Sequence, residues 1–307
     1  MGQKDLAAKD LESRPEVFAD IINALIYEGE QIVSPEQLRP APTETLYESL
    51  VEELDGKADE DMCRRLRNQY NDVSKYETEE QKIRIQYVLE NESSENYRLI
   101  LRKAGYEGAI YRSEYEEKRL FPVAILILYW GKKEWKPCSE LHEFFGENLV
   151  DSTVKEYVDN IKLHMFPMAH LPEEVRKRFK SDMRIIVDYL AEGASYEPSN
   201  QTIKYIEPVM RMLYAYTGEE GFINSIVRLQ SQQEKGEEVT MDAAVEKFVM
   251  RGRKQGIQQG IQQGIQQGIQ QGMDLIRILL ENGREEDVKR SLEDKEYREK
   301  LFQEFDL

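Results

Sequence analysis

Three acidic residues, Asp72, Glu90 and Glu92, have the types and spacing to form one metal site. A polar-apolar alternation predicts a strand over 83–90, and a second candidate strand over 70–76 contains Asp72. Residues at i and i+2 of an extended segment lie on one face, so Glu90 and Glu92 would both face a neighbouring strand that carries Asp72. Clustered carboxylate oxygens are ligands for Mg²⁺, which can activate water and stabilise charge on a phosphodiester.

The same three residues also have a purely structural explanation. Asp72 could belong to a turn or a strand edge, and 90–95 could be the solvated acidic end of a strand. The chain contains 59 Asp and Glu residues, so an Asp followed by Glu-x-Glu is expected by chance. The spacing alone therefore favours a structural role, and only further context supports a catalytic one.

The segments around these acids predict an α/β core. The strands over 70–76 and 83–90 are joined by a short polar segment, which predicts a hairpin. A helical pattern follows over 96–117, although two glycines weaken it. The nearly continuous apolar run 120–130 is typical of a central strand that is covered on both faces.

The rest of the core reads as mainly helical. A proline in the first turn begins a helix that extends from 13 to about 27, and three prolines predict an extended surface connection over 34–45. Further helical patterns occur over 141–145, 173–192 and 199–216.

The C-terminal part contains a Gly-Ile-Gln-Gln repeat with glycines from Gly256 to Gly272 and isoleucines from Ile257 to Ile269. A period of four on a helix turns the isoleucine stripe by about 40° per repeat. Each glycine costs about 1 kcal/mol in a helix interior, so the helix would need a packing partner. Self-association would supply that partner, and a semi-flexible low-complexity spacer is the alternative. We expect a helical tail over 241–307 behind a core over 1–240, whose sheet part covers about 1–150 and whose mainly helical part covers 151–240.

Bulk composition limits the possible functions. The chain has 307 residues and a formal net charge of -17, so any contact with nucleic acid must be local. Its two cysteines, Cys63 and Cys138, have no neighbouring cysteine or histidine at metal-ligand spacing, which excludes a structural zinc site and fits a reducing cytoplasm. No apolar run of about 18 residues occurs, so we expect no membrane span and no signal peptide.

Several short motifs follow one another along roughly residues 15–307. They are Phe18-Ala19-Asp20-Ile21-Ile22-Asn23, 29–38, Asn71-Asp72-Val73 with Leu89-Glu90-Asn91-Glu92-Ser93, Tyr97 with Arg102 and Tyr106, 122–131 with Trp135 and Leu141-His142-Glu143, and the glycine-rich tail repeat. In this order they resemble the PD-(D/E)XK nucleases of the transposase-associated, recombination-promoting kind.

This resemblance implies a restriction-endonuclease-like mixed sheet flanked by helices, and a cytoplasmic endonuclease that acts on DNA with Mg²⁺ or Mn²⁺. It makes Asp72 and Glu90 the metal-binding acids and Glu92 the third catalytic residue. The third motif position is usually Lys or Gln, and a carboxylate there cannot act as a cation. Glu92 could be an extra metal ligand or a general base, while Lys75, Arg98 or Lys103 supplies the charge. The alternative is a catalytically degenerate interaction protein that forms homo-oligomers through its repeat tail.

Overall fold

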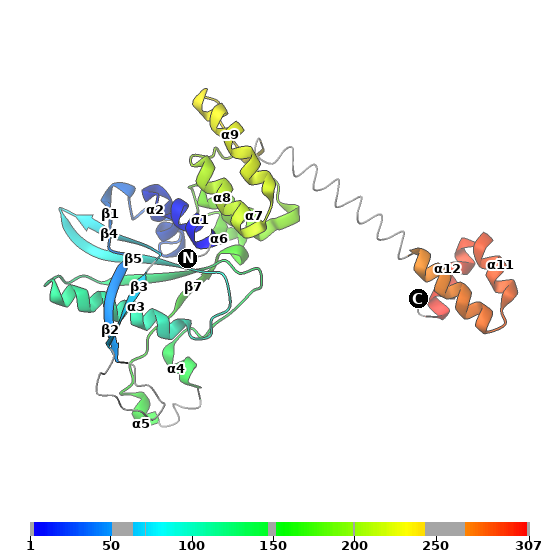
Figure 1. The fold of residues 1–307 in the computed structure, drawn as a ribbon, viewed down its shortest axis with the longest axis horizontal. Coiled ribbons are helices and arrows are strands. Elements are labelled where there is room, and N and C mark those ends of the chain that lie inside the picture. The colour runs from blue at the N-terminus through cyan, green and yellow to red at the C-terminus, as the bar shows by residue number, and fades with distance from the viewer. Residues whose placement is uncertain are drawn as a thin grey trace. The chain divides into compact units, whose positions relative to one another are not determined.

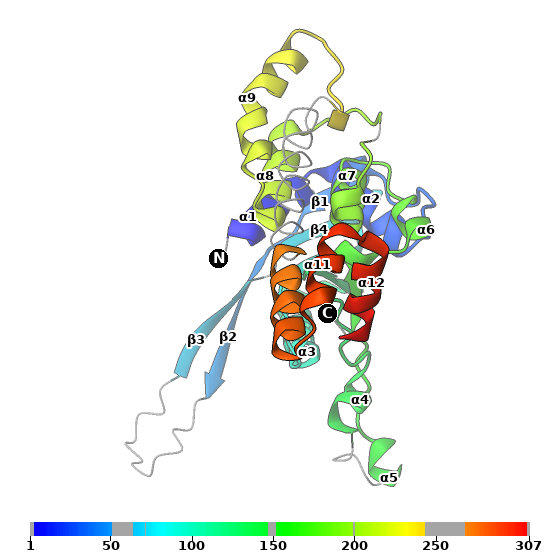
Figure 2. The ribbon, with the colours of Figure 1, turned by 90° about the vertical axis from the view of Figure 1, so that its right-hand side faces the viewer.

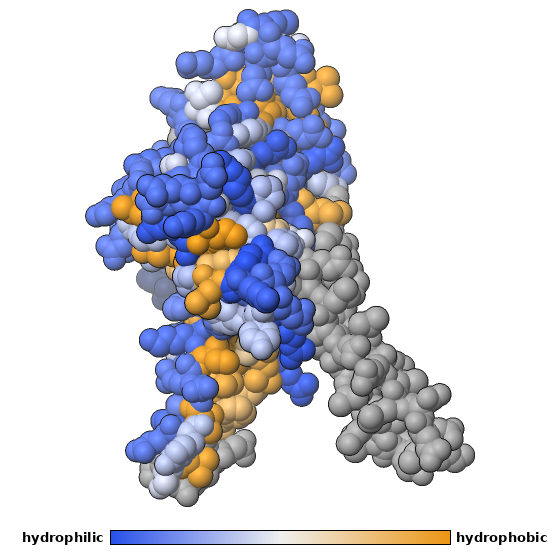
Figure 3. Space-filling model, turned by 90° about the vertical axis from the view of Figure 1, so that its left-hand side faces the viewer, coloured by the Kyte–Doolittle hydropathy of each residue, from blue (hydrophilic) through white to orange (hydrophobic). Residues whose placement is uncertain are grey.

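The computed structural model describes residues 3–50, 64–70, 72–146, 152–198, 200–242 and 268–305. The chain divides into two compact units, Met1–Ala244 and Val245–Leu307 (Figure 1). Hydrophilic residues cover most of the face of the molecule drawn in Figure 3, with apolar residues in smaller patches. Within the described residues, no helix has both the length and the apolar character that a bilayer crossing requires.

A mixed five-stranded sheet forms the centre of the first unit, in the order β1-β4-β5-β6-β7. Neighbours β1, β4 and β5 are antiparallel, whereas β5, β6 and β7 are parallel. The predicted α/β class is therefore confirmed. The strands are β1 Leu38–Pro40, β4 Val73–Glu79, β5 Lys82–Glu92, β6 Val123–Tyr129 and β7 His164–Pro167.

The predicted hairpin is present as β4 and β5, and its register brings Val73 opposite Leu89. Its turn residues Glu80 and Gln81 both have positive φ angles, 48° and 70°, the combination that a two-residue turn of matching twist requires. The first strand of the hairpin was predicted over 70–76, but β4 covers Val73–Glu79, so the predicted bounds were wrong. Asp72 consequently lies just before the strand and not in its middle.

Helices cover both faces of the sheet (Figure 1). Helix α3 (Leu99–Glu116) lies on one face, where Ile100 and Ile110 pack with Val88, Ile127 and Tyr129 of the strands. The other face is covered by α1 (Gln3–Glu12), α2 (Pro15–Leu25), α7 (Met183–Glu192) and α8 (Ile206–Thr217), followed by α9 (Glu220–Glu234).

Several predicted boundaries were wrong. The polar N-terminal segment forms α1, in which Ala8 and Leu11 are buried. The segment predicted as a surface connection contains a 3-10 turn, Pro35–Gln37, and strand β1. The helix expected over 173–192 is two helices, α6 (Glu173–Arg176) and α7, and the one expected over 199–216 begins only at Ile206.

A second, two-stranded antiparallel ribbon consists of β2 (Glu44–Leu50) and β3 (Arg64–Tyr70). Figure 2 shows this ribbon extending away from the five-stranded sheet. The short helices α4 (Leu141–Phe145) and α5 (Ser152–Lys155) precede β7.

The second unit is helical where it is described. Residues 268–281 are helical and are followed by α11 (Glu285–Glu293) and α12 (Lys295–Glu304). Leu275, Leu279 and Leu301 form its small core. Most of the Gly-Ile-Gln-Gln repeat, up to residue 267, lies outside the described residues.

Candidate functional site

Asp72 lies beside Glu90 where strand β4 begins. The Asp72 backbone N–H donates to Glu90 Oε1 at 3.2 Å. The Asn91 backbone N–H donates to Asp72 Oδ2 at 2.7 Å. These two bonds across the hairpin hold the Asp72 carboxylate against the last residues of β5.

Glu90 and Glu92 lie on the same face of β5, as their i, i+2 spacing predicted. Both contact one guanidinium group, that of Arg102 on α3. Arg102 Nη2 is 3.4 Å from Glu90 Oε2, Arg102 Nη1 pairs with Glu92, and Arg102 Nε donates to Tyr106 Oη at 2.7 Å. Glu90 is 1% exposed, so this cation lies against a carboxylate that water scarcely reaches.

Helix α1 supplies two more charged groups to the same region. Lys9 Nζ is 2.9 Å from Asp72 Oδ1. Glu12, which is fully buried, accepts a bond of 2.7 Å from Asn91 Nδ2 through Oε2. Trp130 Nε1 donates to Asn91 Oδ1 at 2.6 Å, so Asn91 links α1 to the end of β6. We call Glu12, Asp72, Glu90 and Glu92 the acidic cluster.

The acidic cluster carries more negative charge than its two cations neutralise. Burial, and then the charge of Asp72, raises the pKa of Glu90 to about 8. Burial raises the pKa of Glu12 to about 8, and the Asp72 charge adds to this effect. The pKa of Glu92 is raised by burial despite the opposing Arg102 charge. A further positive charge would therefore favour the ionised forms of these acids.

The donor chemistry of the cluster suits a hard divalent cation. No group of three His, Cys, Asp or Glu side chains among the described residues is arranged to hold a metal ion. Mg²⁺, however, usually takes one or two protein carboxylates and completes its shell with water and substrate phosphate. Glu12 Oε1 is buried without a hydrogen-bond partner in the described part of the chain. Asp72 and Glu90, which are hydrogen-bonded neighbours, could be the one or two protein carboxylates of such a Mg²⁺ site.

The cations that contact the acidic cluster are not the three considered from the sequence, Lys75, Arg98 and Lys103. Lys75 lies over the ring of Phe18, and Lys103 pairs with Glu107 at 2.5 Å. Arg98 is exposed at the cap position of α3. Lys9 and Arg102 contact the acids instead.

Lys9 and Glu12 were missed because the N-terminal segment gave only a weak helical signal. Its apolar residues, Leu6, Ala7, Ala8 and Leu11, are few, but Ala8 and Leu11 lie three residues apart, and the same spacing separates Lys9 from Glu12. Arg102 belonged to a motif of the resemblance but had no role assigned to it.

The comparisons with known proteins give one finding. A family model described as "Putative transposase, YhgA-like" matches residues 51–235, which is more than half of the chain. This range includes Asp72, Glu90, Glu92 and Arg102, but not α1. No curated protein and no solved structure matches the chain.

Proposed function

The chain belongs to this YhgA-like transposase family, and from that premise we propose that it is a divalent-metal-dependent DNA endonuclease acting in recombination. The proposal rests on two contacts: Asp72 is hydrogen-bonded to Glu90, and Glu90 and Glu92 share the guanidinium group of Arg102. A buried acidic group of this kind, with raised pKa values, is typical of sites that perform chemistry.

In this proposal Asp72 and Glu90 hold Mg²⁺ or Mn²⁺. The metal, when bound, supplies Lewis-acid stabilisation of the phosphodiester and lowers the pKa of a water nucleophile. Glu92 orients Arg102 through their ion pair. Arg102 and Lys9 provide the positive charge that a lysine at the third motif position would otherwise provide.

The β2–β3 ribbon offers a local DNA contact in a chain of net charge -17. Strand β3 ends two residues before Asp72. In the sequence, the two strands of the ribbon contain three arginines, Arg64, Arg65 and Arg67, and two acids, Glu44 and Glu48. A two-stranded ribbon fits the major groove of DNA.

One observation favours the alternative, a catalytically degenerate interaction protein. Lys9 and Arg102 already neutralise much of the charge on Asp72, Glu90 and Glu92. In such a relative the ion pairs would stabilise the fold, and the repeat tail would form the functional contact.

Cleavage of supercoiled plasmid with Mg²⁺ or Mn²⁺ tests the proposal. We expect the intact protein to nick the plasmid and Asp72→Ala to lose at least about a hundredfold in rate, because one of two metal carboxylates is removed. Glu79→Gln, at the far, exposed end of β4, is the matched control and should keep full activity.

The Glu92→Lys variant distinguishes an active nuclease from a catalytically degenerate relative. If Arg102 and Lys9 supply the needed charge, a lysine beside Arg102 repels it, and nicking falls. If the intact protein does not cleave the plasmid and Glu92→Lys does, the site has lost its catalytic cation. If neither the intact protein nor any variant cleaves the plasmid, the nuclease proposal is contradicted and the interaction protein is favoured.

A further inference from the structure

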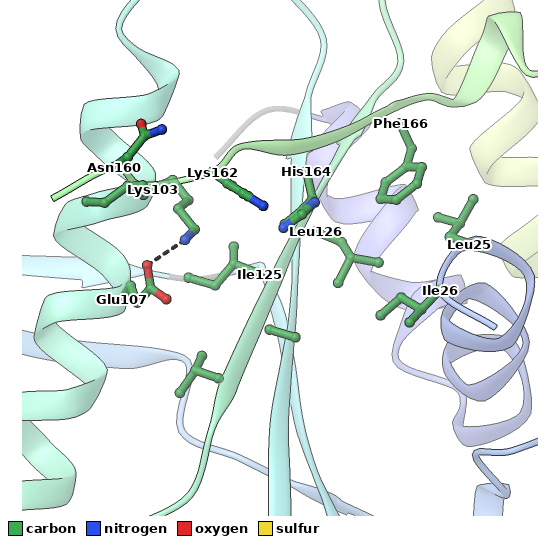
Figure 4. Close-up of a pocket in the computed structure, with 13 residues that line it drawn as sticks. Leu25, Ile26, Lys103, Glu107, Ile125, Leu126, Asn160, Lys162, His164 and Phe166 are labelled. Carbon is green, nitrogen blue, oxygen red and sulfur yellow. Dashed lines mark hydrogen bonds and ion pairs between the residues drawn. The ribbon is translucent and has the colours of Figure 1, made fainter. Parts of the chain in front are cut away.

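A cavity of about 620 Å³ opens at the β7 edge of the sheet (Figure 4). Strand β7 begins at His164, which pairs with Leu126 of β6. The first residues of β6, Val123–Ile125, therefore have no partner in β7. The chain before His164 turns away from β6 instead. The Leu163 N–H donates to Ser139 O at 2.7 Å, and the Leu141 N–H donates to Ile161 O at 2.9 Å. The two diverging segments leave a wedge, which we call the edge cavity.

The walls of the edge cavity are chemically divided. Leu25 and Ile26 from the end of α2, with Leu126 and Phe166, give it an apolar side (Figure 4). Lys103, Lys162 and His164 line the other side, where the Lys103 ammonium faces Glu107 (Figure 4). A ligand pocket typically has this size, mostly apolar walls and a few convergent polar groups.

The polar side is locally positive. Lys103, which is buried, pairs with Glu107, the one carboxylate among the described residues that line the cavity. Within the described residues, neither the Lys162 nor the His164 side chain has a hydrogen-bond or ion-pair partner. The His164 side chain is exposed, but partial desolvation, and then the charges of Lys103 and Lys162, lower its pKa, and Glu107 opposes them only weakly. This positive potential is notable for a chain of net charge -17, because the average surface is acidic.

The edge cavity is separate from the acidic cluster. Residues Val123–Leu126 pair with 86–89 of β5, whereas Glu90 and Glu92 pair with Ile127 and Tyr129 further along β6. None of the acidic-cluster residues lines the cavity. A ligand there would not compete with a metal for the same carboxylates.

We propose that the edge cavity binds a small phosphate-bearing organic molecule, such as a nucleoside monophosphate. The phosphate oxygens accept charge-assisted hydrogen bonds from Lys162, His164 and Lys103, and the organic part covers Leu25, Ile26 and Phe166. A phosphate offers one acceptor oxygen to each of the three donor side chains and carries more negative charge than a carboxylate, so it suits this positive site better.

Proton NMR of the histidine rings tests this binding directly, because the chain contains only three histidines. The full chain carrying Asp72→Ala is titrated with thymidine 5′-monophosphate, with inorganic phosphate, and with thymidine as the uncharged control, all in EDTA. We expect the His164 signals, identified with His164→Gln, to shift with both phosphates and not with thymidine. We also expect the pKa of His164 to rise on binding, because a neighbouring anion favours the imidazolium.

Lys162→Ala should weaken binding about tenfold, the loss expected for one charge-assisted hydrogen bond. Lys235→Ala, an exposed lysine of the same unit, should leave binding unchanged, and the His142 and His170 signals report that each variant is folded. Unshifted His164 signals at millimolar phosphate, or equal binding by Lys162→Ala, would overturn the proposal. A 5′-phosphorylated oligonucleotide distinguishes a free nucleotide from a strand end. If the oligonucleotide binds and thymidine 5′-monophosphate does not, the small-molecule assignment is wrong.

Discussion

Glu12 is the most isolated charge in the acidic cluster. One of its carboxylate oxygens accepts from Asn91, and the other is buried without a partner in the described residues. A buried carboxylate in this position is costly when ionised, because water does not reach it and the favourable effect of the Lys9 charge is smaller than the cost of burial. The cost is reduced when the group is protonated, which explains its pKa of about 8.

This raised pKa predicts that stability depends on pH. The folded protein keeps protons on Glu12 and Glu90 up to about pH 8, whereas the unfolded chain releases them near 4.5. The stabilisation is therefore complete below about pH 4.5 and is lost as the pH rises toward 8. In EDTA, we expect Glu12→Gln to flatten this decline and to be more stable than the parent at pH 8 by about 1–2 kcal/mol.

Urea unfolding at pH values from 5 to 8.5 measures this effect. Glu79→Gln, which replaces an exposed carboxylate, is the control and should follow the parent curve. Parallel curves for Glu12→Gln and the parent would show that Glu12 does not hold the proton.

Each secondary-structure element around the cluster delivers a different group. The β4–β5 hairpin brings Asp72 to Glu90, helix α3 brings Arg102, and helix α1 brings Lys9 and Glu12. The β2–β3 ribbon leads directly into Asp72 and extends away from the sheet (Figure 2). A long substrate at the cluster would therefore pass close to the ribbon.

The arginines of strand β3 lead to a prediction for DNA binding. We expect Arg65→Ala with Arg67→Ala to weaken binding and to reduce the salt dependence of the affinity by about two counterions, one for each lost phosphate contact. Lys235→Ala, which removes an exposed lysine outside the ribbon, is the control and should leave binding unchanged. Fluorescence anisotropy with a duplex at several salt concentrations measures this difference.

An equal loss per removed charge in the double variant and in Lys235→Ala would mean that overall charge, and not the ribbon, determines the affinity. If neither variant changes the affinity, the DNA contact lies elsewhere on the chain.

The two units of the chain have separate cores and different surfaces. In the second unit, Ile269 and Met273 continue the four-residue spacing of the repeat and are 54% and 62% exposed. Leu280 lies on the same side of this helix, because eleven residues from Ile269 are close to three turns, and it is also exposed. This apolar stripe supports the proposal that the tail mediates self-association.

If the tail mediates self-association, removal of 245–307 should leave a monomer with a folded first unit. Ile269→Ser with Met273→Gln should weaken association in the full chain, while Gln270→Ala, beside the stripe, should not. Sedimentation velocity measures the oligomeric state, and circular dichroism checks the fold. An unchanged oligomer after truncation would place the contact on the first unit.

The sequence by itself determined the hairpin, the central strand, the α/β class and the common face of Glu90 and Glu92. These features depend on local alternation and on runs of apolar residues, which are visible along a single segment. The roles of Asp72, Glu90 and Glu92 stay a prediction. Only the tertiary structure decided which cations contact these acids and that the edge cavity exists. The Asn91–Glu12 contact joins residues 79 positions apart, and the cavity forms where β6 and the chain before β7 diverge. Such placements follow from the packing of distant segments, about which local residue patterns carry no information.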